Sequence, residues 1–279
     1  MAEITAAQVK AFRERTGLPL MECKTALQEA GGDEEKAVAI LRERGEKLGE
    51  KRASRETAFG RFGIHAGLDK PAGAIVELKC ESAPVAQNEE FAQLADDMAA
   101  ALAAATATIE TAEQLLELES PSKPGVTLKD QMAELFNRIR EKFEVGRFAK
   151  VEGPSAGYFH NLGTVIGVLL QVEGGDEESA KDVAMHVAAM RPAALQPEDL
   201  DQEQVAQERE FLRAAALKEG KPENIVEKIV EGRLRQYFAE RVLLEQPFVK
   251  DDKQTVGKFA ESKGMSVKKF VCFVLGQSS

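Results

Sequence analysis

The stretch Val9–Gly45, VKAFRERTGLPLMECKTALQEAGGDEEKAVAILRERG, decides the first part of the fold. Just before it, Thr5 and Gln8 have the spacing of a capping box, which predicts a helix that ends at Gly17. Pro19 then favours the start of a second helix, because the first turn of a helix does not use the N–H that proline lacks. These signals predict a series of short helices.

The second predicted helix ends at Gly31 and Gly32, and Asp33 can cap a third. From Cys23 onward its apolar residues recur at i, i+3, i+4 and i+7, so one narrow stripe faces the other two helices. Met21 falls on the opposite side. An exposed methionine is either ordinary surface or part of an adaptable binding surface, and both interpretations stay open. The three helices carry no catalytic group, which indicates a docking module.

Length and charge limit the classes of function. A chain of 279 residues can form two or more domains, and its net charge of -10 argues against direct binding of nucleic acid. No apolar run approaches the roughly 20 residues of a membrane span, and the start MAEITAAQ does not resemble a signal peptide. We expect a cytoplasmic protein with no membrane partner. Cys23, Cys80 and Cys272 lie far apart in apolar contexts, which predicts reduced thiols without a disulfide.

An internal duplication follows a basic connector at residues 47–59. Residues 61–79 and 158–172 each contain an aromatic strand with a histidine, a turn and a β-branched apolar strand, and His65 aligns with His160. Each copy leads into a helix, LADDMAAALAA in the first and SAKDVAMHVAA in the second. The pattern predicts an antiparallel hairpin followed by a helix, twice. We read both histidines as strand residues at the ends of the hairpins.

Further elements complete the predicted α+β fold. Helices are expected near residues 110–118 and after Thr127, and the apolar strand at residues 267–276 can join the sheet of the second hairpin. Near-heptad spacing at residues 202–243 predicts an antiparallel helical hairpin of coiled-coil type, with Phe211 in the apolar stripe of its first arm. The predicted domains are a three-helix docking module at 1–46, the connector at 47–59, a core N-subdomain at 60–150, and a core C-subdomain at 151–279 with the helical hairpin inserted at about 202–243.

The common catalytic and cofactor motifs are missing. The sequence contains no G-x-x-x-x-G-K-[ST] and no G-x-G-x-x-G after a strand, and its histidines lack metal-ligand spacing, so we expect no cofactor and no metal. One enzyme hypothesis has Cys80 as a nucleophile with His65 as its base. An apolar strand before the thiol tends to raise its pKa, which disfavours this hypothesis, and we predict that the protein is not an enzyme.

The first copy carries an insertion that the second lacks, CESAPVAQN at residues 80–88. A loop that is lengthened in one copy only is not required by the fold, so the insertion is a candidate functional site.

Several separated runs resemble one known family. The runs V-K-x-x-R-E-R-T-G-x-x-x-M-x-C-K-x-A-L from Val9, A-M-H-V-A-A from Ala184 and E-Q-P-F-V-K-D from Glu245 are similar to bacterial translation elongation factor Ts, in the same order. The resemblance covers nearly the whole chain. It implies a ubiquitin-associated-like N-terminal module and a guanine-nucleotide exchange factor that binds elongation factor Tu, in its GDP-bound and nucleotide-free states, and promotes GDP release.

The resemblance also implies which residues meet elongation factor Tu. Contacts of the N-terminal module fall on Arg13, Leu20, Met21 and Lys24, the wedge on Ser82, Ala83, Pro84 and Val85, and a contact of the C-subdomain on His186. In the family the wedge usually reads Thr-Asp-Phe and disturbs the magnesium that helps to hold GDP. Here Ser82 keeps the hydroxyl, but Ala83 and Pro84 replace the acidic and aromatic residues. We therefore expect exchange with weaker magnesium displacement.

Alternatives from other classes stay open. One is a stabiliser or scaffold that binds elongation factor Tu with weak or no exchange activity, because Ala83 and Pro84 replace the usual pair. The other is the Cys80 enzyme. A homodimer through the helical hairpin also stays open, since a heptad-like hairpin can pair with itself.

Overall fold

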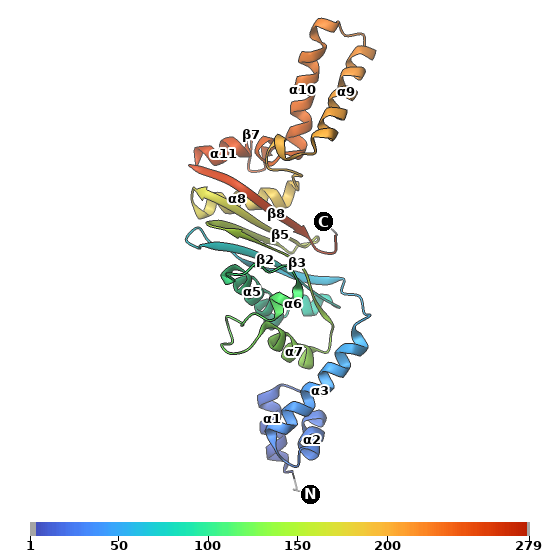
Figure 1. Cartoon of the computed structure of the whole chain (residues 1–279), viewed down its shortest axis with the longest axis vertical. Coiled ribbons are helices and arrows are strands. Elements are labelled where there is room, and N and C mark those ends of the chain that lie inside the picture. Colours follow the sequence, from blue (N-terminus) through green and yellow to red (C-terminus); the bar gives the residue numbers. More distant parts are fainter. Residues whose placement is uncertain (1–3, 278–279) are drawn as a thin grey trace. The chain divides into compact units, whose positions relative to one another are not determined.

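The structure, a computed structural model, describes residues 4–277 and divides into two compact units. The first unit comprises residues 4–65, 74–150 and 275–277, and the second comprises residues 66–73 and 151–274. Each unit contains helices and a three-stranded sheet (Figure 1). The predicted α+β class is confirmed at this level.

The N-terminal helices are α1 (Ala6–Thr16), α2 (Leu20–Glu29) and α3 (Glu34–Arg52). Their predicted starts are confirmed: the side chains of Thr5 and Gln8 each accept a hydrogen bond from the other's backbone N–H, and Asp33 accepts from two N–H groups of α3. The core between the helices buries Val9, Phe12, Leu18, Cys23, Ala26, Leu27, Ala37 and Leu41. Helix α3 continues to Arg52, so part of the predicted connector is helical.

The first unit also contains the sheet with order β1-β2-β3. Its strands are β1 (Phe59–His65), β2 (Ala72–Cys80) and β3 (Phe143–Glu152), and its helices after β2 are α4 (Ala83–Ala86), α5 (Glu89–Ala104), α6 (Ala112–Leu116) and α7 (Leu128–Ile139). Strands β1 and β2 pair antiparallel, with Phe59 opposite Cys80. Helix α5 approaches β1 so closely that a Cβ at Gly63 would lie 1.9 Å from the carbonyl oxygen of Ala95. Only glycine permits this packing.

The second unit contains the sheet with order β4-β5-β8, and both pairings are antiparallel. Its strands are β4 (Ser155–His160), β5 (Ile166–Gly174), β6 (Pro247–Phe248), β7 (Asp251–Thr255) and β8 (Met265–Val274), and its helices beside them are α8 (Glu177–Met190) and α11 (Val256–Ser262), with 3₁₀ turns at Pro197–Asp199 and Leu243–Glu245. The prediction that the last apolar strand joins the second hairpin is confirmed by the pairing of β8 with β5. His65 and His160 end β1 and β4, as predicted.

Helices α9 (Gln202–Lys218) and α10 (Glu223–Arg241) form the helical hairpin. A small cluster of Ala216, Val226, Val230 and Leu234 joins them. Phe211 is 67% exposed, so its predicted place in the apolar stripe is wrong. Within the described residues, no helix has both the length and the apolar character needed to cross a bilayer.

Candidate partner-binding site

The insertion at residues 80–88 folds into one helical turn between β2 and α5. Cys80 is the last residue of β2, and Ser82 precedes α4, with Pro84 in the first turn, where its missing N–H costs no helical hydrogen bond. The side chain of Asn88 accepts hydrogen bonds from the N–H groups of Glu90 and Phe91 and so begins α5. The insertion is therefore ordered at both ends.

The tip of this loop is exposed and uncharged. Ala83 and Pro84 are exposed, and Ser82 and Val85 are half-buried. The side chain of Ser82 makes no capping bond to α4 and instead donates to Glu141 Oε1 at 2.7 Å. We name Ser82–Val85 the wedge loop. Its tip offers a small apolar surface to a partner, and the ring of Pro84 limits its backbone freedom.

The structure does not support Cys80 as a catalytic nucleophile with His65 as its base. The thiol is buried, and burial raises its pKa to about 11, so almost no thiolate is present near neutral pH. In the β1–β2 pairing, Cys80 lies opposite Phe59, whereas His65 lies opposite Ala74. Six residue-to-residue steps along β1 separate Phe59 from His65, which is about 20 Å at ~3.3 Å per residue. His65 therefore cannot serve as the base.

Glu81 anchors the root of the wedge loop. Its carboxylate accepts a hydrogen bond from the backbone N–H of Lys142 at 2.6 Å and from the guanidinium of Arg55 at 2.8 Å, and it lies 3.6 Å from the guanidinium of Arg52. Burial opposes ionisation, but the hydrogen bonds from Lys142 and Arg55 outweigh it, so the pKa of Glu81 is lowered. Glu81 is thus a carboxylate fixed by cations and a backbone donor.

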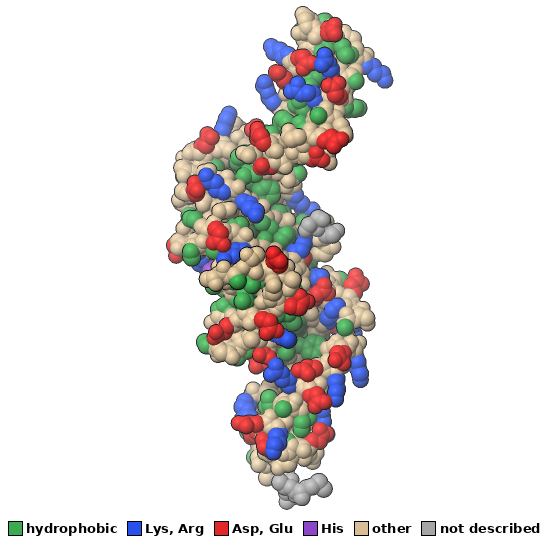
Figure 2. Space-filling view, viewed as in Figure 1, with side chains coloured by type: hydrophobic (Ala, Val, Ile, Leu, Met, Phe, Trp, Pro, Cys, Tyr) green, Lys and Arg blue, Asp and Glu red, His purple; other side chains and the backbone are tan. Residues whose placement is uncertain are grey.

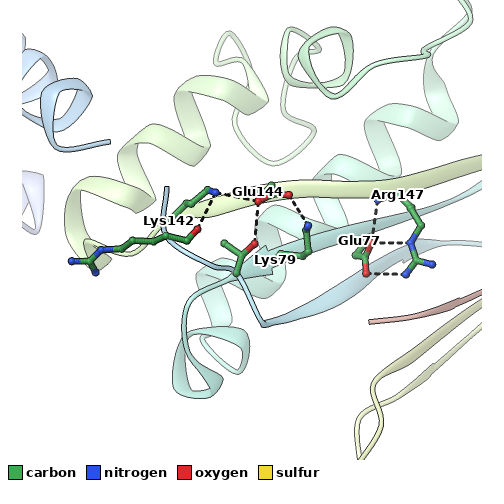
Figure 3. Close-up of polar contacts among 7 residues, drawn as sticks. Glu77, Lys79, Lys142, Glu144 and Arg147 are labelled. Carbon is green, nitrogen blue, oxygen red and sulfur yellow. Dashed lines mark hydrogen bonds and ion pairs between the residues drawn. The ribbon is translucent and has the colours of Figure 1, made fainter. Parts of the chain in front are cut away.

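Charged pairs also join β2 to β3 beside the loop (Figure 3). Glu144 accepts from Lys79 at 2.6 Å and from the hydroxyl of Thr57 at 3.0 Å, and the hydrogen bond from Lys79 chiefly lowers its pKa. Glu77, 3% exposed, accepts two 3.0 Å bonds from the guanidinium of Arg147. The wedge loop follows directly after this ion-paired part of the sheet.

The residues predicted on the N-terminal module lie at its surface. Leu20 is 47% and Met21 65% exposed, and Lys24 is exposed on the next turn of α2. Arg13 is exposed on α1, while Cys23 on the opposite side of α2 is fully buried. All four predicted residues are accessible to a partner.

His186 lies inside the second unit. Its ring is fully buried, and its Nε2–H donates to Gln246 Oε1 at 2.9 Å while Nδ1 accepts from the N–H of Val249 at 3.2 Å. Burial lowers the pKa of His186, and this hydrogen-bond arrangement requires the neutral ring. The ring does not reach the surface, so it holds the segment from Gln246 to Val249 in place, where the Val249 side chain is 44% exposed.

Between residues 4 and 277, no group of three or more His, Cys, Asp or Glu side chains is arranged to hold a metal. Figure 2 shows acidic side chains among basic ones over the N-terminal helices and the helical hairpin on the face drawn.

Comparisons with known proteins agree on one family. A family model described as Elongation factor TS matches residues 81–277. Proteins named Elongation factor Ts are similar over nearly the whole chain. The one from Methylococcus capsulatus (strain Bath) is 44% identical over 277 residues, which cover 98% of this chain and 92% of the relative. The one from Azoarcus sp. (strain BH72) is 43% identical over 279 residues, 99% of this chain and 92% of the relative. This chain belongs to the elongation factor Ts family.

Proposed function

We propose that this chain accelerates GDP release from elongation factor Tu by inserting the wedge loop beside the nucleotide site. The chain is a guanine-nucleotide exchange factor, and the similarity to elongation factor Ts proteins over nearly its whole length is the observation that carries this conclusion. That similarity favours exchange over the alternative of a stabiliser without exchange activity.

Exchange is a negative coupling between two ligands of one protein. The factor weakens GDP binding by the same ratio by which GDP weakens binding of the factor. Such coupling needs contacts that differ between the states of elongation factor Tu, and no bond is made or broken. The exposed, uncharged tip on a fixed root is the part of the molecule suited to this task.

We further propose roles for the N-terminal module, the C-subdomain and the helical hairpin. The ubiquitin-associated-like module docks first, through Arg13, Leu20, Met21 and Lys24. The core is a duplicated hairpin-plus-helix unit, and the C-subdomain meets a second part of elongation factor Tu through the surface that His186 supports. The protein acts in the cytoplasm on GDP-bound and nucleotide-free elongation factor Tu, without enzyme chemistry. The helical hairpin is available for pairing with a second copy.

The test is stopped-flow release of fluorescent GDP from elongation factor Tu of the same source. We expect the chain to accelerate release, and we expect the double variant Ala83→Asp, Pro84→Phe to accelerate it further at high magnesium. The added carboxylate and aromatic ring displace the ion more strongly than alanine and proline can. Unchanged GDP release with the wild-type chain would reject exchange, and a tight complex with that result would indicate the stabiliser. Equal rates for wild type and variant at every magnesium concentration would reject only the magnesium argument.

A further inference from the structure

The wedge loop has little to hold its own shape. Helix α4 is a single turn. An isolated helix of this length is unstable, because ordering the first turn costs more free energy than its few hydrogen bonds provide. The tip residues Ala83 and Pro84 are exposed, and no side chain caps the turn. Apart from the hydrogen bond from Ser82 to Glu141, the direction in which the tip points depends on how its root is held.

The root is fixed by contacts to two other segments of the first unit. Glu81 is paired with Arg52, the last residue of α3, and with Arg55 just after it, and it accepts from the N–H of Lys142 just before β3. The side chain of Lys142 donates back to the carbonyl of Arg55 at 3.1 Å. Glu81, Arg55 and Lys142 are thus each bonded to the other two, and the side chain of Glu81 is only 16% exposed.

The second copy of the duplicated unit contains no equivalent of this cluster. There β5 ends at Gly174 and α8 begins at Glu177, with the side chain of Asp176 accepting from the N–H of Ser179 to cap the helix. The short connection leaves no loop to hold. The contacts of Glu81 are thus a feature of the insertion and are not required by the duplicated hairpin-plus-helix fold.

We infer that Glu81 is a positioning residue for exchange: it fixes the wedge loop to the end of α3, and so joins the helix that carries the docking module to the segment that disturbs the nucleotide site. This inference rests on the proposed function. Arg55 is 51% exposed, so solvent screens its pair with Glu81 and limits what these ion pairs contribute to global stability. Their removal should therefore alter what the loop does after docking much more than it alters folding or docking itself.

The test compares full-length wild type with Glu81→Gln, which keeps the size of the side chain and removes its charge. GDP release from elongation factor Tu is measured over a range of factor concentrations. We expect the maximal release rate to fall by roughly fivefold, at the low end of couplings between sites, while the half-saturating concentration changes by less than about twofold. Glu134→Gln is the matched control, because it removes one carboxylate of the same unit from a 2.7 Å pair with Lys123, and it should leave both quantities unchanged.

A double-mutant cycle separates positioning from a structural effect. Arg55→Gln should also lower the maximal rate. The double variant should be little slower than Glu81→Gln alone, because both changes break the same Arg55–Glu81 pair. An unchanged maximal rate in Glu81→Gln, with wild type active, would overturn the positioning role alone. The positioning role would also be overturned if the loss of rate in Glu81→Gln came with a lowered melting temperature or with a comparable rise in the half-saturating concentration. A wild-type chain that does not accelerate release would instead reject the proposed function.

Discussion

Individual side chains in this molecule divide between those that support backbone segments and those that meet solvent. Glu81 and His186 are buried or nearly so, and each holds a segment that carries exposed residues. Met21 belongs to the other class, with 65% of its surface exposed on α2. The sequence pattern predicted the exposure of Met21, because helical spacing places it opposite Cys23. It could not predict the burial of His186, which depends on Gln246 and Val249, far away in the chain.

Replacement of Met21 should affect binding and leave folding intact. We expect Met21→Glu to weaken binding to elongation factor Tu roughly tenfold, since an apolar anchor at an interface typically contributes more than 1 kcal/mol, and to change the free energy of unfolding by no more than about 0.5 kcal/mol. Isothermal titration calorimetry and urea unfolding measure the two effects. Val38→Glu is the control, because Val38 is 45% exposed on α3 of the same module. An equal loss of affinity in both variants would contradict a specific contact at Met21.

His186 should make stability depend on pH in one direction. Its pKa in the folded protein is lowered from 6.5, so on acidification the unfolded chain binds the proton first. The stabilisation by neutral His186 is therefore complete above about pH 6.5 and is lost as the pH falls below it. Protonation also places an N–H against the N–H of Val249.

The measurement is urea unfolding of wild type and His186→Gln at pH 7.5 and 5.5. We expect the variant to be less stable by about 1–2 kcal/mol at pH 7.5, because the buried bonds to Gln246 and Val249 are disturbed. The difference should shrink at pH 5.5. A difference that stays constant or grows on acidification would show that His186 is not held in its neutral form.

At the level of elements, the close packing of α5 on β1 depends on one glycine. Gly63→Ala places a Cβ 1.9 Å from Ala95 O and 2.2 Å from Ala95 C, which are backbone atoms that cannot turn away. We expect a loss of about 1–3 kcal/mol in the free energy of unfolding, typical of overpacking. Urea unfolding of wild type and variant measures the loss.

Gly232→Ala is the opposite case and the natural control. In α10 the added Cβ meets no atom within 4 Å, so the better helix propensity of alanine should stabilise the hairpin by up to about 1 kcal/mol. If both alanine variants shift stability in the same direction, close packing at Gly63 is not the cause of its effect.

Some elements could be predicted from the sequence and others could not. Local sequence signals predict the capped helices and the hairpins. Examples are the capping pair of Thr5 and Gln8 and the apolar run before Cys80. Strand β3 was missed because Glu144 and Arg147 interrupt its apolar pattern. Both charges have partners on β2, which is far away in the sequence. The hairpin phase was wrong at Phe211 because a near-heptad count does not tell which residues face the second helix.

For the whole molecule, the family and the candidate site could be predicted from the sequence. The contacts that anchor the root of the wedge loop could not. The insertion at residues 80–88 stands out because the second copy lacks it. Its contacts with Arg55 and Lys142 join segments that no periodicity connects. The predicted domain boundaries stay predictions. The structure divides into two compact units, with residues 66–73 grouped with the second.

The pairing of β5 with β8 has a consequence for biosynthesis. Residues 175–264 must be translated between the two strands, which takes roughly 5–20 s at ~5–20 residues per second. Throughout that interval one edge of β5 has no native neighbour on the ribosome, and an open strand edge is a template for pairing with another nascent chain. Neighbouring nascent copies of this chain on one polysome are therefore exposed to edge-to-edge pairing until β8 emerges.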